Sequence, residues 1–176
     1  MSEKVIFLDF DGPLSNPRVI LYAGNDNAID PVALGALNNL CEATGVKIVC
    51  SSTRTLAGHA ENFEETKRLL QEAGLDLKHL HEDWSCFYSD KTTREEHIRK
   101  WLHHHPEVTH YAIIDDEKIK LRKHLVRVTE MDGLQVQHFE KLAKILDFNI
   151  IDVFNHARNK WYQNKLGRRA EAGLTP

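Results

Sequence analysis

The apolar run from Val5 to Leu8 restricts the possible folds of this chain more than any other feature. A continuous apolar run without polar alternation is typical of a strand buried on both faces, as in a parallel sheet covered by helices. Two carboxylates, Asp9 and Asp11, follow it directly, and the turn-forming pair Gly12-Pro13 comes next. Because an isolated buried charge is costly, the strand must end at an edge that supplies partners for these carboxylates.

The same pattern of an apolar run ending in polar residues recurs along the chain. Residues Val46–Cys50 lead into Ser51-Ser52-Thr53-Arg54, and residues His110–Ile114 end at Asp115 and Asp116. Further strands are expected at Leu125–Thr129 and, as a short strand, near either Lys78–Leu80 or Ser85–Tyr88.

Caps and apolar periodicity predict helices between these strands, whereas the Gly-, Pro- and Asn-rich segment Gly12–Asn27 is expected to be a loop. Two of the helices are expected to open with capping boxes, formed by Asn62 with Glu65 and by Thr92 with Glu95. The expected helices lie between the caps Asp30 and Gly45, at Phe63–Ala73, between Thr92 and Pro106, at Leu134–Leu146 and at Ile150–Leu166.

Strands that alternate with helices at this spacing pair in parallel through right-handed crossovers. The expected fold is therefore α/β, a Rossmann-like three-layer sandwich with a mainly parallel sheet and no large cap domain. Residues 1–149 are expected to form the main unit. Residues 150–176 add a C-terminal helix and a basic tail to the same single domain.

Composition is that of an ordinary globular protein. The 176 residues are 41% hydrophobic and 28% charged, and a formal net charge of −3 gives no overall attraction to nucleic acid or membranes. No segment approaches the roughly 18 apolar residues of a membrane span, so no membrane partner and a cytoplasmic location are expected. The three cysteines, Cys41, Cys50 and Cys86, are expected to be small core residues in a reducing compartment. The sequence does not indicate an oligomeric state.

Four carboxylates, Asp9, Asp11, Asp115 and Asp116, are expected at one edge of the sheet, because ligands of open parallel sheets bind beyond the carboxyl ends of the strands. They would repel one another unless a cation joined them. Oxygen-rich ligation without matching Cys or His residues points to Mg²⁺. Since Mg²⁺ commonly binds through carboxylates and phosphate oxygens together, a phosphorylated substrate is expected.

Residues at this edge suit phosphoryl transfer. An aspartate can attack phosphorus and form an aspartyl-phosphate, so Asp9 is the expected nucleophile and Asp11 the general acid and base. A hydroxyl from Ser51 or Ser52 would hold the phosphate, and a cation, Lys91 or Arg94, would neutralise the transferring group. Arg54 is expected either to bind phosphate or to be a solvated surface charge.

These motifs resemble those of the haloacid dehalogenase-like (HAD) phosphatases. The corresponding segments are DFDGPL at Asp9 to Leu14, CSSTR at Cys50 to Arg54, SDKTTREEHI at Ser89 to Ile98 and IIDD at Ile113 to Asp116. The chain is most similar to the HAD domain of Swiss Army Knife RNA repair proteins. The Ser-x-Arg motif, which favours Ser52 over Ser51, and the Asp-Asp pair also resemble the phosphatase half of phage polynucleotide kinase-phosphatase.

The resemblance implies a Mg²⁺-dependent phosphohydrolase with a phosphoenzyme at Asp9. Because no long insertion could form a cap, an open site for nucleotides or nucleic-acid ends is expected, as in a 5'-nucleotidase or a polynucleotide phosphatase. Pro13 departs from the family, which usually has Thr or Val after DxDG. The alternative is a catalytically degenerate module that binds a nucleotide or a partner protein.

Two other segments allow more than one interpretation. The triplet His103-His104-His105 could bind a metal, but is expected to be the last turn of a helix, where imidazoles favour the negative end of the helix dipole. Residues Lys160–Arg169 interleave aromatic and basic side chains and could contact a phosphodiester backbone. The favoured interpretation is an amphipathic helix that packs Trp161 on the sheet layer.

Overall fold

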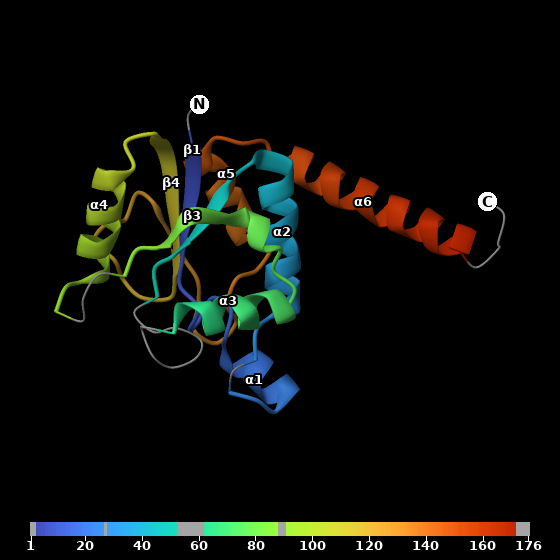
Figure 1. The fold of residues 1–176 in the computed structure, drawn as a ribbon, viewed down its shortest axis with the longest axis horizontal. Coiled ribbons are helices and arrows are strands. Elements are labelled where there is room, and N and C mark those ends of the chain that lie inside the picture. The colour runs from blue at the N-terminus through green and yellow to red at the C-terminus, as the bar shows by residue number, and fades with distance from the viewer. Residues whose placement is uncertain (1–2, 27, 53–61, 88–90, 172–176) are drawn as a thin grey trace.

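The computed structural model describes residues 3–26, 28–52, 62–87 and 91–171 (Figure 1). Its centre is a five-stranded, all-parallel sheet with the strand order β3-β2-β1-β4-β5. The expected α/β fold with a parallel sheet is confirmed, and no large cap domain is seen among the described residues. The strands are β1 (Glu3–Leu8), β2 (Lys47–Cys50), β3 (Leu80–Ser85), β4 (Val108–Asp115) and β5 (Leu125–Arg127).

Helices cover both faces of this sheet, and alternate residues of β1 face the two layers. Ile6 and Leu8 pack with α2 (Pro31–Thr44), α3 (Phe63–Glu72), α5 (His138–Leu146) and the start of α6 (Ile150–Glu171). Val5 and Phe7 pack on the other side against Ile98 and Trp101 of α4 (Arg94–His104). The fully buried apolar run is thus explained by helices on both faces.

Strand register places the ends of three strands at one level. Leu8 of β1 pairs with Cys50 of β2 on one side and with Ile114 of β4 on the other. The next step of each ladder is also formed, since the Asp9 N–H donates to the Ile114 carbonyl and the Ser51 N–H donates to the Leu8 carbonyl, both at 3.0 Å. The polar residues that follow the three strands therefore meet at the carboxyl edge of the sheet.

A short helix, α1 (Pro17–Ala23), lies within the segment that was expected to be a loop, so that expectation was wrong. The Asn16 side chain accepts a hydrogen bond from the Val19 N–H, Pro17 occupies the first helical turn and Gly24 ends the helix in a left-handed conformation. These are ordinary start and stop signals, but they occur among residues that are also common in turns.

The boundaries of several other helices and strands differ from the expected ones by a few residues. Strand β3 bridges the two positions considered for it, and the capping box of α4 forms between Thr93 and Glu96, one residue later than expected. Asn62 makes no side-chain cap bond, so the expected capping box is not formed, and Glu65 pairs with Arg68. Helix α5 begins four residues later than expected.

Helix α6 extends beyond the body of the domain (Figure 1). Its first turns are anchored by buried Val153 and by the Glu42 carboxylate, which pairs with His156 at 3.0 Å and with Lys160 at 2.7 Å. Trp161 is 53% exposed, so the expectation that it packs on the sheet layer was wrong. The body of the domain does not reach far enough to cover this part of the helix.

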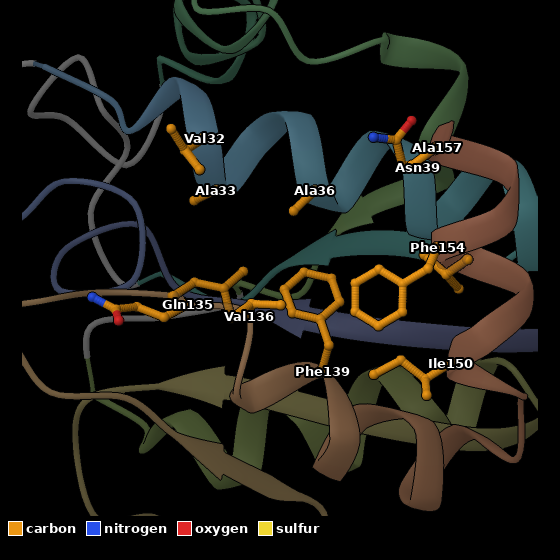
Figure 2. Close-up of a pocket in the computed structure, with 12 residues that line it drawn as sticks. Val32, Ala33, Ala36, Asn39, Gln135, Val136, Phe139, Ile150, Phe154 and Ala157 are labelled. Atoms are coloured by element: carbon orange, nitrogen blue, oxygen red, sulfur yellow. The ribbon is translucent and has the colours of Figure 1, made fainter. Parts of the chain in front are cut away.

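Helices α2, α5 and α6 enclose an apolar hollow of about 160 Å³ (Figure 2). Ala36, Phe139, Ile150 and Phe154 line it, and Asn39 and Gln135 are its only polar lining residues in the described part of the chain. The hollow offers no carboxylate or cation for phosphate chemistry. The site that the sequence predicts must therefore be sought at the strand ends.

Cys41, Cys50 and Cys86 are buried free thiols, as expected for small core residues. None of the helices that the structure describes combines the length and the apolar character that a bilayer crossing requires.

The loop after β1 is closed by a second loop that precedes α5. The Phe10 carbonyl accepts from the N–H groups of Leu14 and Ser15, and the Pro13 carbonyl accepts from the Leu134 N–H at 2.9 Å. Gly133 has a positive φ of 68°, and a Cβ at this position would lie 2.7 Å from the Pro13 carbonyl oxygen. A glycine is needed here for both the backbone conformation and the close approach.

We expect Gly133→Ala to lower the free energy of unfolding by about 2 to 4 kcal/mol, because it adds a steric clash to the cost of a left-handed alanine. Gly45→Ala is the matched control. Gly45 has a similar φ of 74°, but no atom lies within 4 Å of the place that a Cβ would occupy there. It should cost only about 1 kcal/mol. Urea denaturation measures both, and equal losses would contradict the packing of the two loops.

Candidate active site

Three carboxylates meet at the carboxyl edge of the sheet. Asp9 follows β1, Asp115 is the last residue of β4 and Asp116 follows it. Each offers an oxygen atom, and these oxygens all lie within 4.8 Å of one another. Asp9 and Asp115 are buried and Asp116 is half-buried. Such a cluster of carboxylate oxygens fits a hard divalent cation such as Mg²⁺.

Arg94 connects two of these carboxylates. Its Nη1 donates to Asp9 Oδ2 at 2.8 Å and also to Asp115 Oδ2. Arg94 is the first residue of α4, and the Thr93–Glu96 capping box fixes the point at which that helix begins. Only 12% of its side chain is exposed. The start of α4 thus places a buried cation at the ends of β1 and β4.

Burial and charge oppose each other at this site. Burial raises the pKa of Asp9 from 3.8 to about 7, against the lowering effect of the Arg94 guanidinium, and the neighbouring Asp115 raises it further. Burial also raises the pKa of Asp115, again opposed by Arg94. For Arg94, burial favours the neutral form, but the two carboxylates outweigh it and raise the pKa. Arg94 therefore stays charged while Asp9 titrates near neutrality in the metal-free protein.

The two serines after β2 are both buried beside Asp9. The Ser52 hydroxyl donates a hydrogen bond to the Asp9 carboxylate. Ser51 Oγ and Asp9 Oδ1 are buried polar atoms with no hydrogen-bond partner among the described residues. Buried polar atoms are rarely left unsatisfied, so these two mark a place where a polar ligand would be bound.

Asp11 lies apart from the three clustered carboxylates and is exposed. It was expected beside Asp9 because side chains two residues apart share a face of an extended strand. Instead the chain bends at Phe10, whose carbonyl accepts from Leu14 and Ser15. Alternation of side chains along a strand no longer applies after this bend. The roles given to Asp11 as general acid and base and as metal ligand stay predictions.

Of the two candidate cations, Arg94 contacts the carboxylates, whereas Lys91 is exposed in the turn before α4. The catalytic role given to Lys91 and the substrate-binding role given to Arg94 stay predictions, although the contacts favour Arg94 for charge neutralisation. Arg54 lies outside the described residues.

Backbone groups and one further arginine also shape the site. The Glu117 N–H donates to Asp115 Oδ1 at 2.8 Å and so orients that carboxylate. Arg127 Nε donates to the Asp116 carbonyl at 2.9 Å. Sequence reasoning did not identify Arg127, although a cation at the end of the β5 strand, level with Asp115, was a usable signal.

The histidine triplet His103-His104-His105 forms no competing metal site in the described structure. The triplet ends α4 as expected, with His104 as the last helical residue and His105 as the cap. His105 approaches His81 and Glu107 closely enough to share an ion. However, His81 Nδ1 accepts a hydrogen bond from the Asp83 N–H, so a neutral His81 carries its proton on Nε2 and offers no free lone pair.

A model of the HAD domain in Swiss Army Knife RNA repair proteins matches residues 5–139. The match includes all the site residues described above and ends within α5, so that α6 lies outside it. No curated protein and no solved structure matches the chain significantly.

We expect Asp9→Asn to stabilise the metal-free protein above pH 7 by an amount on the order of 3 kcal/mol. Because the pKa of Asp9 is raised to about 7 in the folded chain, folding takes up a proton between about pH 4 and pH 7. Stability of the wild type therefore falls as the pH rises through this window, and the neutral amide removes that loss. Denaturant unfolding in EDTA from pH 4 to pH 8 measures the difference. A difference that does not grow with pH would contradict the burial of an ionisable Asp9.

Proposed function

Because the chain belongs to the family of the HAD domain in Swiss Army Knife RNA repair proteins, we propose that it is a Mg²⁺-dependent phosphohydrolase. The family suggests a HAD-type phosphohydrolase. The observation that carries the proposal is the contact of Arg94 with Asp9 Oδ2, which leaves Asp9 Oδ1 without a partner. One oxygen of the carboxylate is held in place, while the other makes no hydrogen bond that would lower its nucleophilicity.

The charges at the site support a divalent cation. With Asp9, Asp115 and Asp116 ionised, the positive charge of Arg94 leaves a net charge of −2. These carboxylates are the residues that would hold Mg²⁺, and the ion would supply charge neutralisation for the incoming phosphate. Exposed Asp11 is kept as a fourth candidate ligand.

The proposed reaction has two steps. Asp9 Oδ1 attacks phosphorus, the bond to the ester oxygen breaks, and Asp11 gives a proton to the leaving alcohol. Asp11 then takes a proton from water, which attacks the aspartyl-phosphate, releases phosphate and restores the Asp9 carboxylate. Arg94 stabilises charge in both steps, and the Ser51 and Ser52 hydroxyls hold the phosphate oxygens.

The proposed substrates are phosphomonoesters of nucleotides or nucleic-acid ends. Support comes from the absence of a large cap domain among the described residues. The family description, which refers to RNA repair, agrees with this choice. A 5'-nucleotidase and a polynucleotide phosphatase are the two forms of the proposal.

Two features motivate the alternative, a degenerate module that binds a nucleotide or a partner protein: Pro13 and the basic tail. The turn closes without an N–H at this position, since Gly12 donates to the Ser15 carbonyl at 2.7 Å and Leu14 donates to the Phe10 carbonyl at 2.9 Å. Pro13 also contributes its carbonyl as an acceptor for Leu134. The geometry of the loop thus gives the degenerate module no support.

We expect the purified protein to hydrolyse at least one of a panel of mononucleotides and phosphorylated oligonucleotides, and to require Mg²⁺. Asp9→Asn should lower kcat by at least about 1,000-fold, because the amide cannot attack phosphorus. Phosphate release measures turnover. Mg²⁺-dependent hydrolysis by Asp9→Asn at the wild-type rate would exclude the mechanism. Tight nucleotide binding without hydrolysis by the wild type would favour the degenerate module.

Two pairs of variants test which cation neutralises charge at the site and which serine acts beside Asp9. Arg94→Met should lower kcat/KM by about 100-fold or more, whereas Lys91→Met should have a smaller effect, because only Arg94 is buried against Asp9 and Asp115. Ser52→Ala should likewise cost more than Ser51→Ala, since Ser52 already bonds to Asp9. Steady-state kinetics on the best substrate of the panel measure all four variants. The reverse order in either pair would exchange the assigned roles.

A further inference from the structure

A basic hollow of about 410 Å³ shares Arg127 with a second hollow, which Asp116 of the proposed metal site lines. We define the basic hollow by its lining residues, the cations Lys118, Lys120, Arg122 and Arg127 and the apolar Ile119 and Leu125. All four cationic residues are exposed, and the lining includes no carboxylate. The chain as a whole has a formal net charge of −3, so this concentration of positive charge is local.

The segment between β4 and β5 creates the hollow by alternating its side chains. Ile119 is buried and Leu121 is partly buried, and both pack into the core on the α4 side of the sheet. Lys118, Lys120 and Arg122 are exposed at the intervening positions. The Lys120 N–H donates to Glu95 Oε1 at 2.6 Å and so ties the segment to the start of α4.

The cations of the hollow form no ion pairs in the described part of the chain, although the Glu95 carboxylate lies beside Lys120. Among the residues that the structure describes, no carboxylate forms an ion pair with Lys118, Lys120, Arg122 or Arg127. Cations gathered around one concavity repel one another and raise the local concentration of anions. An anionic ligand would relieve this repulsion.

Arg127 joins the basic hollow to the active site. It also lines a neighbouring hollow of about 600 Å³, together with three acidic residues, Asp116, Glu117 and Glu130, and with Val128 and Thr129. Its Nε donates to the Asp116 carbonyl at 2.9 Å, and strand register places it beside Asp115. Arg127 therefore lies between Asp116 of the proposed metal site and the other three cations of the basic hollow.

We propose that the basic hollow binds a second phosphate group of the substrate, namely the internucleotide phosphate next to the terminal phosphomonoester. This inference rests on the proposed function, because the terminal phosphate must lie at Asp9. Four cations exceed what one monoester requires, and they suit the closely spaced phosphates of a nucleic-acid strand. A nucleoside bisphosphate would present the same chemistry from a smaller molecule.

The first test measures binding without turnover. The probe is a fluorescein-labelled, single-stranded 12-nucleotide RNA with hydroxyl ends, followed by fluorescence anisotropy at several salt concentrations. Lys118→Ala/Arg122→Ala removes two cations that contact none of the proposed catalytic residues. We expect its Kd to rise about tenfold, and the slope of log Kd against log salt to fall by about 1.4, since each lost contact on a single strand contributes about 0.7.

The matched control is Lys141→Ala/Lys144→Ala, which removes the same charge from exposed positions of α5, on the opposite face of the sheet from α4. It should leave both Kd and the slope unchanged. Equal weakening by the two pairs, or none by the first pair, would overturn the proposal. Arg158→Ala/Lys165→Ala tests the exposed basic side chains of α6. If only this pair weakened binding, the strand would lie on α6 and the proposal would also be overturned.

Kinetics identify the source of the second phosphate. For an end-phosphorylated oligonucleotide, Lys118→Ala/Arg122→Ala should raise KM about tenfold with little change in kcat, while KM for a mononucleotide monophosphate stays constant. A raised KM for a nucleoside bisphosphate alone would assign the hollow to the small molecule and overturn the choice of a strand. RNA binding that depends on the hollow in a protein without phosphatase activity would refute the proposed function but not the hollow. Activity on mononucleotides, together with RNA binding that the double variant leaves unchanged, would refute the role of the hollow but not the proposed function.

Discussion

The contact of the Arg94 guanidinium with two buried carboxylates, Asp9 and Asp115, holds the carboxyl edge of the sheet together. Asp9 follows β1 and Asp115 ends the neighbouring strand β4, so the two carboxylates would repel each other in a region with little access to water. Arg94 compensates this repulsion and, as the first residue of α4, fixes a helix to both strand ends. The same charges that stabilise the pairing also hold one oxygen of Asp9 and leave the other without a partner. Structural and proposed catalytic demands are met by the same atoms.

Charge is distributed unevenly around that edge. Carboxylates gather at the ends of β1 and β4, whereas cations gather on the segment between β4 and β5, with Arg127 between the two groups. The apolar hollow between α2, α5 and α6 lies in the opposite helical layer from α4 and shares no lining residue with either group. A phosphorylated substrate would thus meet a cation-binding region and an anion-binding region side by side, each with its own chemistry.

The sequence was most informative where burial dictated the pattern. The run Val5–Leu8 and the carboxylates after it could be placed because a strand covered on both faces must be apolar throughout. The choice between Lys91 and Arg94 depended on where α4 begins, and capping boxes at Thr92 and Thr93 differ by a single residue. The position of Asp11 depends on a bend of the chain at Phe10. The exposure of Trp161 depends on how far α2 extends along α6. These outcomes are set by tertiary contacts, which local patterns do not encode.

Parallel pairing also sets the order in which the chain can fold during synthesis. Strand β1 is completed first, but its partner β4 follows only about 100 residues later in the chain. At typical elongation rates of about 5 to 20 residues per second, the ribosome needs roughly 5 to 20 s to supply it. Until then only β2 can pair with β1, and it covers one of the two edges of that strand. The central position of β1 therefore makes the nascent chain dependent on protection from aggregation for several seconds.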